Sequence, residues 1–243
     1  MKRTVFYLSL FALMGITIQV IRVWPDGKLH IFFCDVGQGD GIYIRYPNGL
    51  DMLIDGGSPN QQILQCLTKA MPFYDRHIDV VLLTHPQEDH MGGLVDVLQR
   101  YSLSYFVIPP ISNNSDGYKK LLSVLRQKAI PVKNLYTGAK LAFGASTFSI
   151  VWPEREWIAS KMKSATCKIQ NGICIIDEQG DIFASEVSNV LGVATTEDLN
   201  HYSNIAELSY GSFDAVFTGD GDSLTQQMMM AKGYGIFQVG KTR

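Results

Sequence analysis

The sequence has few cysteines and no excess charge of one sign, and each shortage excludes a class of protein. Only 4 of its 243 residues are Cys and no CxxC pair occurs, which excludes a disulfide scaffold and a zinc site built from paired cysteines. Lys and Arg number 21 against 23 Asp and Glu, a formal net charge of −2, so no strong basic patch for nucleic acid is expected. The chain is 46% hydrophobic, with 22 Gly and 9 Pro, which excludes a disordered, collagen-like or coiled-coil protein.

An uncharged stretch opens the chain. Residues 4–21 comprise 18 positions without a charge, flanked by Lys2 and Arg3 on one side and by Arg22 on the other. A spanning helix needs about 17–25 apolar residues, so we expect residues 1–24 to form a single-pass membrane anchor. The two leading basic residues favour a cytoplasmic N-terminus, with the rest of the chain on the extracytoplasmic side of the cell membrane. A cleaved signal peptide and a buried N-terminal helix are the alternatives.

The remaining chain, residues 28–243, has the pattern of one α/β (α+β) domain. Short apolar runs alternate with Gly, Asn and Asp, and the first three of them predict a β-meander. Expected strands cover 29–34, 41–46, 50–54, 79–84, 105–109, 140–143, 147–152, 205–210 and 213–218. Expected helices cover 61–71, 92–101, 117–128 and 223–232. This mixture predicts sheet packed on sheet with helices outside.

Metal-ligand chemistry is concentrated between one expected strand and the helix after it. The run His85-Pro-Gln-Glu-Asp-His90 places two imidazoles and two carboxylates within six residues, in an expected loop. These are ligands that zinc, manganese and iron accept. Gly92 and Gly93 would let the backbone turn tightly beneath a metal. A solvated polar turn is the alternative for this segment alone.

Two other strand ends carry an Asp beside Gly. Asp55 precedes a Gly pair, and Asp220 follows Gly219. Either one alone is typical of an ordinary turn. Three such strand ends in one chain instead indicate a metal site, because a pair of metal ions needs a carboxylate that bridges them.

These segments, in this order, resemble the hydrolase domain of ComEC-type DNA-uptake proteins in the metallo-β-lactamase superfamily. Four motifs of the sequence carry the resemblance: Asp35-Val-Gly-Gln-Gly-Asp40, Leu53-Ile-Asp-Gly-Gly57, the HxHxDH-like run from Leu83 to Gly93, and Phe217-Thr-Gly-Asp220. It implies an αββα sandwich with one or two divalent metal ions at the edge between the sheets, zinc first and manganese as the alternative. It also implies a DNA or other phosphodiester substrate and a membrane channel as partner.

The resemblance further implies a role for each motif residue. His85 and Gln87 would hold the first metal, Asp89 and His90 the second, and Asp220 would bridge them. Asp89 and Asp55 are the expected catalytic residues, with Asp55 orienting a ligand by a hydrogen bond. In that arrangement, water activated by the metals attacks the phosphodiester.

Other carboxylates and histidines are expected to stand outside this set. Asp35 and Asp40 are expected to fix their Gly-rich turn through backbone hydrogen bonds. His201 lies in a segment, Asn200-His-Tyr-Ser203, whose Asn and Ser match the related proteins better than its His does. It is either a ligand or an exposed loop residue.

Two departures open an alternative function. Gln87 stands where the related proteins have His or Asp, and a neutral amide is a weak zinc ligand, which favours one metal or a harder ion. The related proteins continue from a Val-Gly into a His-His-Gly segment, whereas Val239-Gly240 is followed here by three residues. We therefore expect the C-terminal part of the sandwich to be missing, and a non-catalytic binding module or truncated gene product is the alternative to a hydrolase.

The cysteines carry separate expectations. Cys34 and Cys66 lie in apolar segments and are expected to be buried as small hydrophobic residues. Cys167 and Cys174 are close in sequence, and a disulfide between them stays open.

Overall fold

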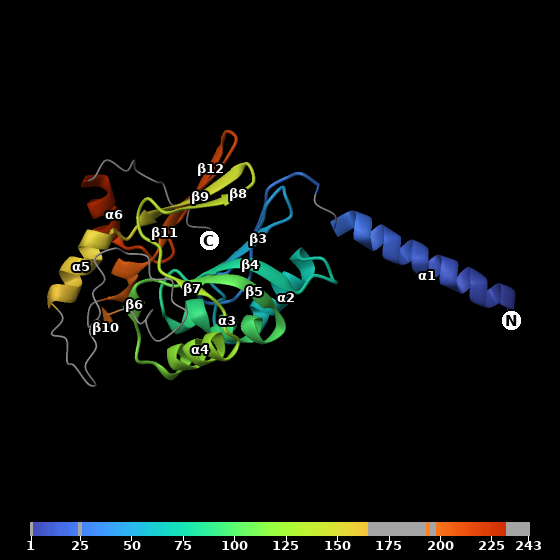
Figure 1. Cartoon of the computed structure of the whole chain (residues 1–243), viewed down its shortest axis with the longest axis horizontal. Helices are drawn as coiled ribbons and strands as arrows, with labels where there is room; N and C mark the ends of the chain where they lie inside the picture. Colours follow the sequence, from blue (N-terminus) through green and yellow to red (C-terminus); the bar gives the residue numbers. More distant parts are fainter. Residues whose placement is uncertain (1, 24–25, 165–192, 195–197, 232–243) are drawn as a thin grey trace.

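The computed structural model describes residues 2–23, 26–164, 193–194 and 198–231 (Figure 1). Cys167 and Cys174, whose pairing the sequence leaves open, and the chain after Ala231 lie outside these residues.

The first sheet combines an antiparallel meander with parallel strands, in the order β1-β2-β3-β4-β5-β7. β1, β2 and β3 pair antiparallel, as the sequence predicts, and β3, β4, β5 and β7 are parallel. The bounds are β1 His30–Phe33, β2 Ile42–Arg45, β3 Asp51–Ile54, β4 His77–Leu82, β5 Ser102–Val107 and β7 Val132–Lys133. The carboxyl ends of β3 and β4 lie side by side, with Ile54 paired to Leu82. The segments that follow these two strands therefore begin at one edge of the sheet.

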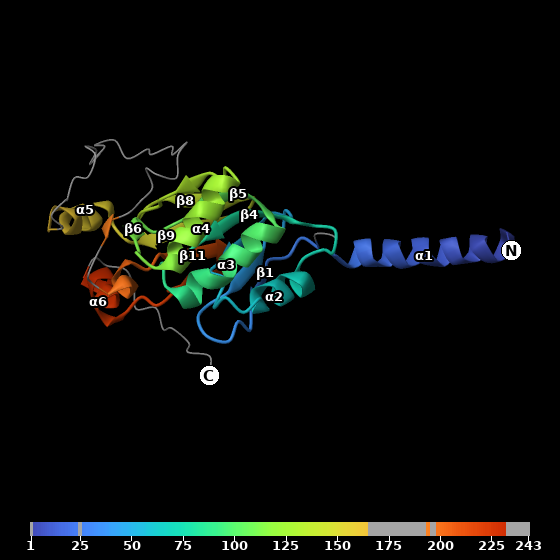
Figure 2. The same cartoon turned by 90° about the horizontal axis from the view of Figure 1, so that it is seen from below.

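Three helices cover the outer face of this sheet (Figure 2). They are α2 Gln62–Ala70, α3 Glu88–Arg100 and α4 Asp116–Gln127. Leu67, Leu94 and Leu121 are fully buried against the sheet residues Val81 and Phe106. Complete burial of one such side chain contributes about 1.5–3 kcal/mol, so this apolar layer holds the helices on the sheet.

The second sheet has the order β12-β11-β9-β8 and is antiparallel. Its strands are β8 Lys140–Phe143, β9 Ser146–Trp152, β11 Ile205–Tyr210 and β12 Phe213–Phe217. Phe148 and Leu208 are fully buried and pack with Ile44 and Ile54 of the first sheet. The two sheets therefore enclose a common core, as expected from the sequence.

The remaining elements lie beside the second sheet. α6, Ser223–Ala231, contributes Met229 to a cluster with Val151 and Ile205. The others are α5 Arg155–Ser164, a short parallel pair of β6 Ile111–Ser112 with β10 Val193–Ala194, and the 3₁₀ helix η2 Leu199–Tyr202. The result is a mixed α/β sandwich with helices outside both sheets, consistent with the predicted αββα arrangement.

The N-terminal stretch forms α1, Lys2–Val23, which projects from the domain (Figure 1). Its apolar side chains are exposed; Phe6 is 63% and Phe11 is 73% accessible to solvent. Within the described part of the chain, no helix is long and apolar enough to cross a membrane.

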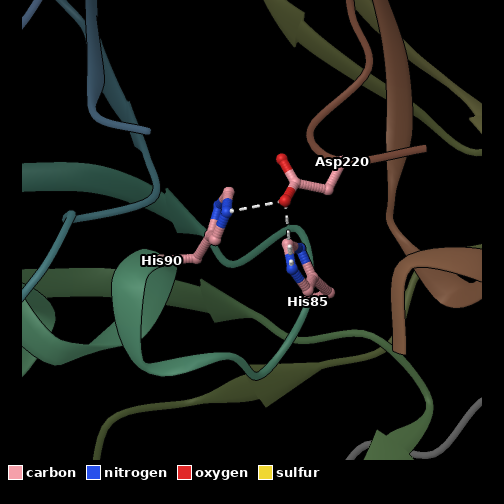
Figure 3. A group of neighbouring side chains, drawn as sticks. All are labelled: His85, His90 and Asp220. Atoms are coloured by element: carbon pink, nitrogen blue, oxygen red, sulfur yellow. Dashed lines mark ion pairs between the residues drawn. The ribbon is translucent and has the colours of Figure 1, made fainter. Parts of the chain in front are cut away.

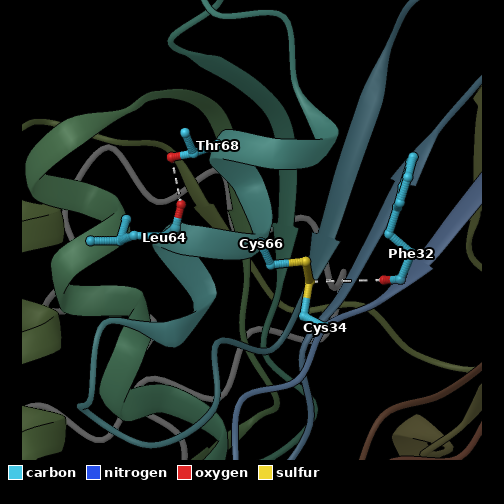
Figure 4. Close-up of a disulfide and its surroundings, with 5 residues drawn as sticks. All are labelled: Phe32, Cys34, Leu64, Cys66 and Thr68. Carbon is cyan, nitrogen blue, oxygen red and sulfur yellow. Dashed lines mark hydrogen bonds between the residues drawn. A yellow bond between two sulfur atoms is a disulfide. The ribbon is translucent and has the colours of Figure 1, made fainter.

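The expectation for Cys34 and Cys66 is wrong. They form a disulfide with a Cα–Cα distance of 5.6 Å, joining the residue after β1 to α2 (Figure 4). The meander places the end of β1 beside the helix, which brings two cysteines 32 residues apart within bonding range. Their apolar setting did not reveal this, because pairing depends on tertiary distance.

The start of α3 also differs from the prediction. The helix begins at Glu88, ahead of the expected start at Gly92, so Asp89 and His90 lie in its first turn and not in a loop. Acidic residues in a first turn are favoured by the helix dipole. Gly93 lies inside the helix, where a Cβ would collide with the carbonyl oxygen of Gly56. Close packing of the helix on the segment after β3, and not a turn, requires this glycine.

Candidate metal centre

Three predicted ligands converge at the edge between the sheets (Figure 3). His85 follows β4, His90 lies in the first turn of α3, and Asp220 follows β12. The Oδ2 atom of Asp220 lies 3.5 Å from Nε2 of His90 and 4.0 Å from Nε2 of His85. One potential ligand atom from each residue lies within 4.8 Å of the other two. A single ion could therefore be coordinated by all three residues.

The two imidazoles present nitrogens that the protein itself does not satisfy. His85 and His90 are 0% and 1% exposed, and among the described residues neither Nε2 has a hydrogen-bond partner. A buried polar atom without a partner costs about 1–3 kcal/mol, so native proteins rarely keep one without a function. A divalent metal between these nitrogens and Asp220 would satisfy both, and the residues present fit such an ion.

Asp55 holds His90 in position through Nδ1, the ring nitrogen that does not face Asp220. Its buried carboxylate accepts hydrogen bonds from the Thr84 backbone N–H at 2.7 Å, the Thr84 hydroxyl at 2.6 Å and His90 Nδ1 at 2.8 Å. A carboxylate on Nδ1 keeps the proton there and leaves Nε2 free to face the site. Asp55 has φ of 55°, in the left-handed region that costs a non-Gly residue of order 1 kcal/mol or more.

The electrostatics differ sharply between the two histidines. Burial alone would lower the pKa of His90, but the nearby carboxylates of Asp220 and Asp55 outweigh it and raise the pKa to about 10. Burial and repulsion from His90 lower the pKa of His85. The contact with His90 lowers the pKa of Asp220. In the metal-free protein, His90 and Asp220 thus form an ion pair beside a neutral His85, and a metal would replace the proton of His90.

Gln87 and Asp89 lie at the margin of this cluster. Gln87 is the N-cap of α3, and its Nε2 donates to Oδ1 of Asn200 at 3.2 Å. Asp89 is half-buried and accepts a hydrogen bond from Gln38 at 3.4 Å. The structure therefore brings His85, His90 and Asp220 together, while these two side chains contact neighbouring polar groups.

His201 faces another partner. Its Nε2 lies 2.9 Å from Oδ2 of Asp222, and its backbone carbonyl accepts a hydrogen bond from Trp152. His201, which the sequence leaves as either a ligand or a loop residue, is thus paired with a carboxylate outside the His85 cluster.

Asp40 is the site residue that sequence reasoning missed. A potential ligand atom of Asp40 lies within 4.8 Å of those of Asp55 and His90. The only signal in the sequence was its place at the end of the motif Asp35–Asp40, which is also typical of a turn.

The chain belongs to the metallo-β-lactamase superfamily: the sequence profile of that superfamily matches residues 34–160, just over half of the chain. ComE operon protein 3 of Bacillus subtilis (strain 168) is 24% identical over 147 residues, covering 54% of this chain and 19% of that protein. The chain thus matches less than a fifth of that relative.

Two solved structures are weakly similar to this chain. The metallo-β-lactamase fold protein YhfI from Bacillus subtilis is 12% identical with a TM-score of 0.41, over 78% of this chain and 61% of its own. The diiron β-hydroxylase CmlA from Streptomyces venezuelae is 18% identical with a TM-score of 0.43, over 86% of this chain and 33% of its own.

Proposed function

We propose that this protein is a divalent-metal-dependent hydrolase of phosphodiesters, with nucleic acid as the substrate class. The observation that carries the proposal is the pair of buried, unpartnered Nε2 atoms of His85 and His90 facing the carboxylate of Asp220. A purely structural domain gains nothing from this arrangement, because buried polar atoms without partners destabilise the fold.

Each residue of the site would have a separate role in hydrolysis. His85, His90 and Asp220 would hold a divalent ion, which would supply positive charge and lower the pKa of water at the site toward about 7. Asp55 keeps the His90 proton on Nδ1, so that this ring binds as a neutral ligand. Asp220 is 42% exposed at its side chain, so this edge of the site is open to a substrate. Two imidazoles with one carboxylate suit zinc, and further carboxylates would favour manganese.

The substrate class is proposed from sequence likeness. The four motifs resemble those of DNA-uptake proteins, and a curated relative is ComE operon protein 3. With a formal net charge of −2, the chain offers little general attraction for a polyanion. We therefore propose that a nucleic-acid strand is held mainly at the metal and is handed to or from a membrane channel partner.

We also propose that the protein is attached to the cell membrane through α1, with the domain on the extracytoplasmic side. The exposed apolar side chains of α1 support attachment, because water solvates them poorly. The Cys34–Cys66 disulfide supports the extracytoplasmic location of the domain, because disulfides persist mainly in oxidising compartments.

The test is hydrolysis by the full chain after metal removal with a chelator. Single-stranded DNA, duplex DNA and bis(p-nitrophenyl) phosphate are offered with Zn²⁺ or Mn²⁺. We expect metal-dependent cleavage that is lost in His85→Ala and kept in His30→Ala, since His30 pairs with Asp26 and belongs to neither group of potential ligands. Circular dichroism checks that both variants fold. Metal binding without cleavage of any substrate would favour the binding-module alternative, and failure to bind either ion would overturn the proposal.

A further inference from the structure

The loop between β1 and β2, residues 34–41, lies directly against the start of α3. Gln38 donates a hydrogen bond to Asp89 at 3.4 Å. Gly39, with φ of 85°, approaches so closely that a Cβ on it would collide with the carbonyl oxygen of Asp89. Only glycine allows this contact, and it brings the next residue, Asp40, to the metal centre.

The loop is held firmly at its base. The backbone N–H of Cys34 donates to the carbonyl of Gly41 at 2.8 Å, and the disulfide ties Cys34 to α2 (Figure 4). The side chain of Asn60 donates to the carbonyl of Val36 at 2.8 Å. These bonds fix the position of Asp40 relative to the helices that carry the site.

The sequence led us to expect that Asp40 fixes its own turn, and the structure does not bear this out. Its side chain makes no hydrogen bond to any residue that the structure describes. A potential ligand atom of its carboxylate instead lies within 4.8 Å of those of Asp55 and His90. Burial and the charges of Asp55, Asp220 and Asp89 raise the pKa of Asp40, and the charge of His90 opposes them. Carboxylates gathered in this way repel one another unless a cation lies between them.

We propose that Asp40 is a ligand of the metal ion held by His90 and Asp220. This inference rests on the proposed metal-dependent function and names a ligand that it does not require. The independent observation is His90, which is 1% exposed and has an Nε2 without a hydrogen-bond partner among the described residues. A second carboxylate would balance the charge of a divalent ion whose other neighbours, the imidazoles, are neutral when bound.

The first test compares two loop carboxylates in the full-length protein. Asp40→Asn and Asp35→Asn make the same chemical change in one loop, but Asp35 is exposed and belongs to neither group of potential ligands. Zn²⁺ and Mn²⁺ are titrated separately into metal-free protein by calorimetry. We expect Asp40→Asn to weaken binding of the preferred ion at least about tenfold and Asp35→Asn to leave it within about twofold. Equal affinity in Asp40→Asn and the parent protein would overturn the inference.

A second test separates ligation from a general effect of charge. In Asp40→Cys loaded with Co²⁺, a thiolate ligand produces a sulfur-to-cobalt charge-transfer absorption, whereas Asp35→Cys should show none. Peptide mapping under non-reducing conditions verifies that Cys34 and Cys66 remain paired in both. Absence of the band from Asp40→Cys counts against ligation by residue 40. If the parent protein binds no metal, the proposed function fails; if it binds metal and the Asp40 variants match it, this inference alone fails.

Discussion

The Oδ2 atom of Asp55 lies 2.8 Å from Nδ1 of His90, with both side chains buried. Through this contact, the residue that follows β3 sets the direction of a ring carried by α3. The same carboxylate accepts the backbone N–H and the hydroxyl of Thr84, the residue before His85. One side chain thus positions both imidazoles, directly for His90 and through its neighbour for His85.

We expect Asp55→Asn to weaken divalent-metal binding about 10–100-fold, the usual effect of removing a partner that orients a metal ligand. The amide retains an acceptor for Thr84 but no longer holds the proton of His90 with a negative charge. Calorimetric titration of the metal-free protein measures the effect. Asp214→Asn, an exposed position on β12, is the matched control. Unchanged affinity in Asp55→Asn would show that His90 needs no orienting carboxylate.

Removal of the disulfide should destabilise the domain. The bond closes a loop with a sequence separation of 32 residues, for which chain entropy gives a stabilisation of about 3–4 kcal/mol. The double variant Cys34→Ser/Cys66→Ser should therefore lose about that much free energy of unfolding, measured by urea titration. A midpoint equal to that of the oxidised parent would mean that the covalent bond adds nothing to the packing of α2 on the sheet.

Asp51 should make stability depend on pH. Burial raises its pKa from 3.8 to about 7, opposed by hydrogen bonds from the Asp79 backbone and from Tyr43. The folded protein therefore binds more protons than the unfolded chain between about pH 4 and 7, and the contribution of Asp51 falls as pH rises through that window.

The variant Asp51→Asn isolates this effect, because its amide does not titrate. Urea unfolding at pH 4.5, 6 and 8 should show the variant gaining stability relative to the parent as pH rises, by up to a few kcal/mol. Asp214→Asn should follow the parent at every pH. A constant difference between the parent and Asp51→Asn would mean that the buried carboxyl titrates normally.

Gly39 and Gly138 are a matched pair for measuring how much stability depends on the close contact between the β1–β2 loop and α3. Both have positive φ, 85° and 91°, but a Cβ would collide with Asp89 only at Gly39, and at Gly138 it would meet nothing within 4 Å. Gly138→Ala should cost about 1–2 kcal/mol from the left-handed backbone alone. We expect a larger loss in the free energy of unfolding, together with weaker metal binding, for Gly39→Ala. Equal costs for the two variants would mean that the loop moves away from α3 without penalty.

Local patterns in the sequence determined most of the strands and helices and the residues able to bind metal, although β7 and α5 were not among the expected elements. Apolar runs of strand length, the Gly-rich breaks and the polar strand ends at His85, Asp55 and Asp220 depend on neighbours within a few residues, so they are visible without a structure. They also predict sheet packed on sheet, because each element must bury one face.

Contacts between distant residues were decided only by the tertiary structure. The Cys34–Cys66 bond joins residues 32 apart, and the Gln87–Asn200 hydrogen bond joins residues 113 apart. The approach of Asp40 to His90 depends on how the β1–β2 loop packs against α3. No short-range pattern encodes these distances, because they arise from the packing of whole elements, and that packing decides which of several suitable side chains meet at the metal centre.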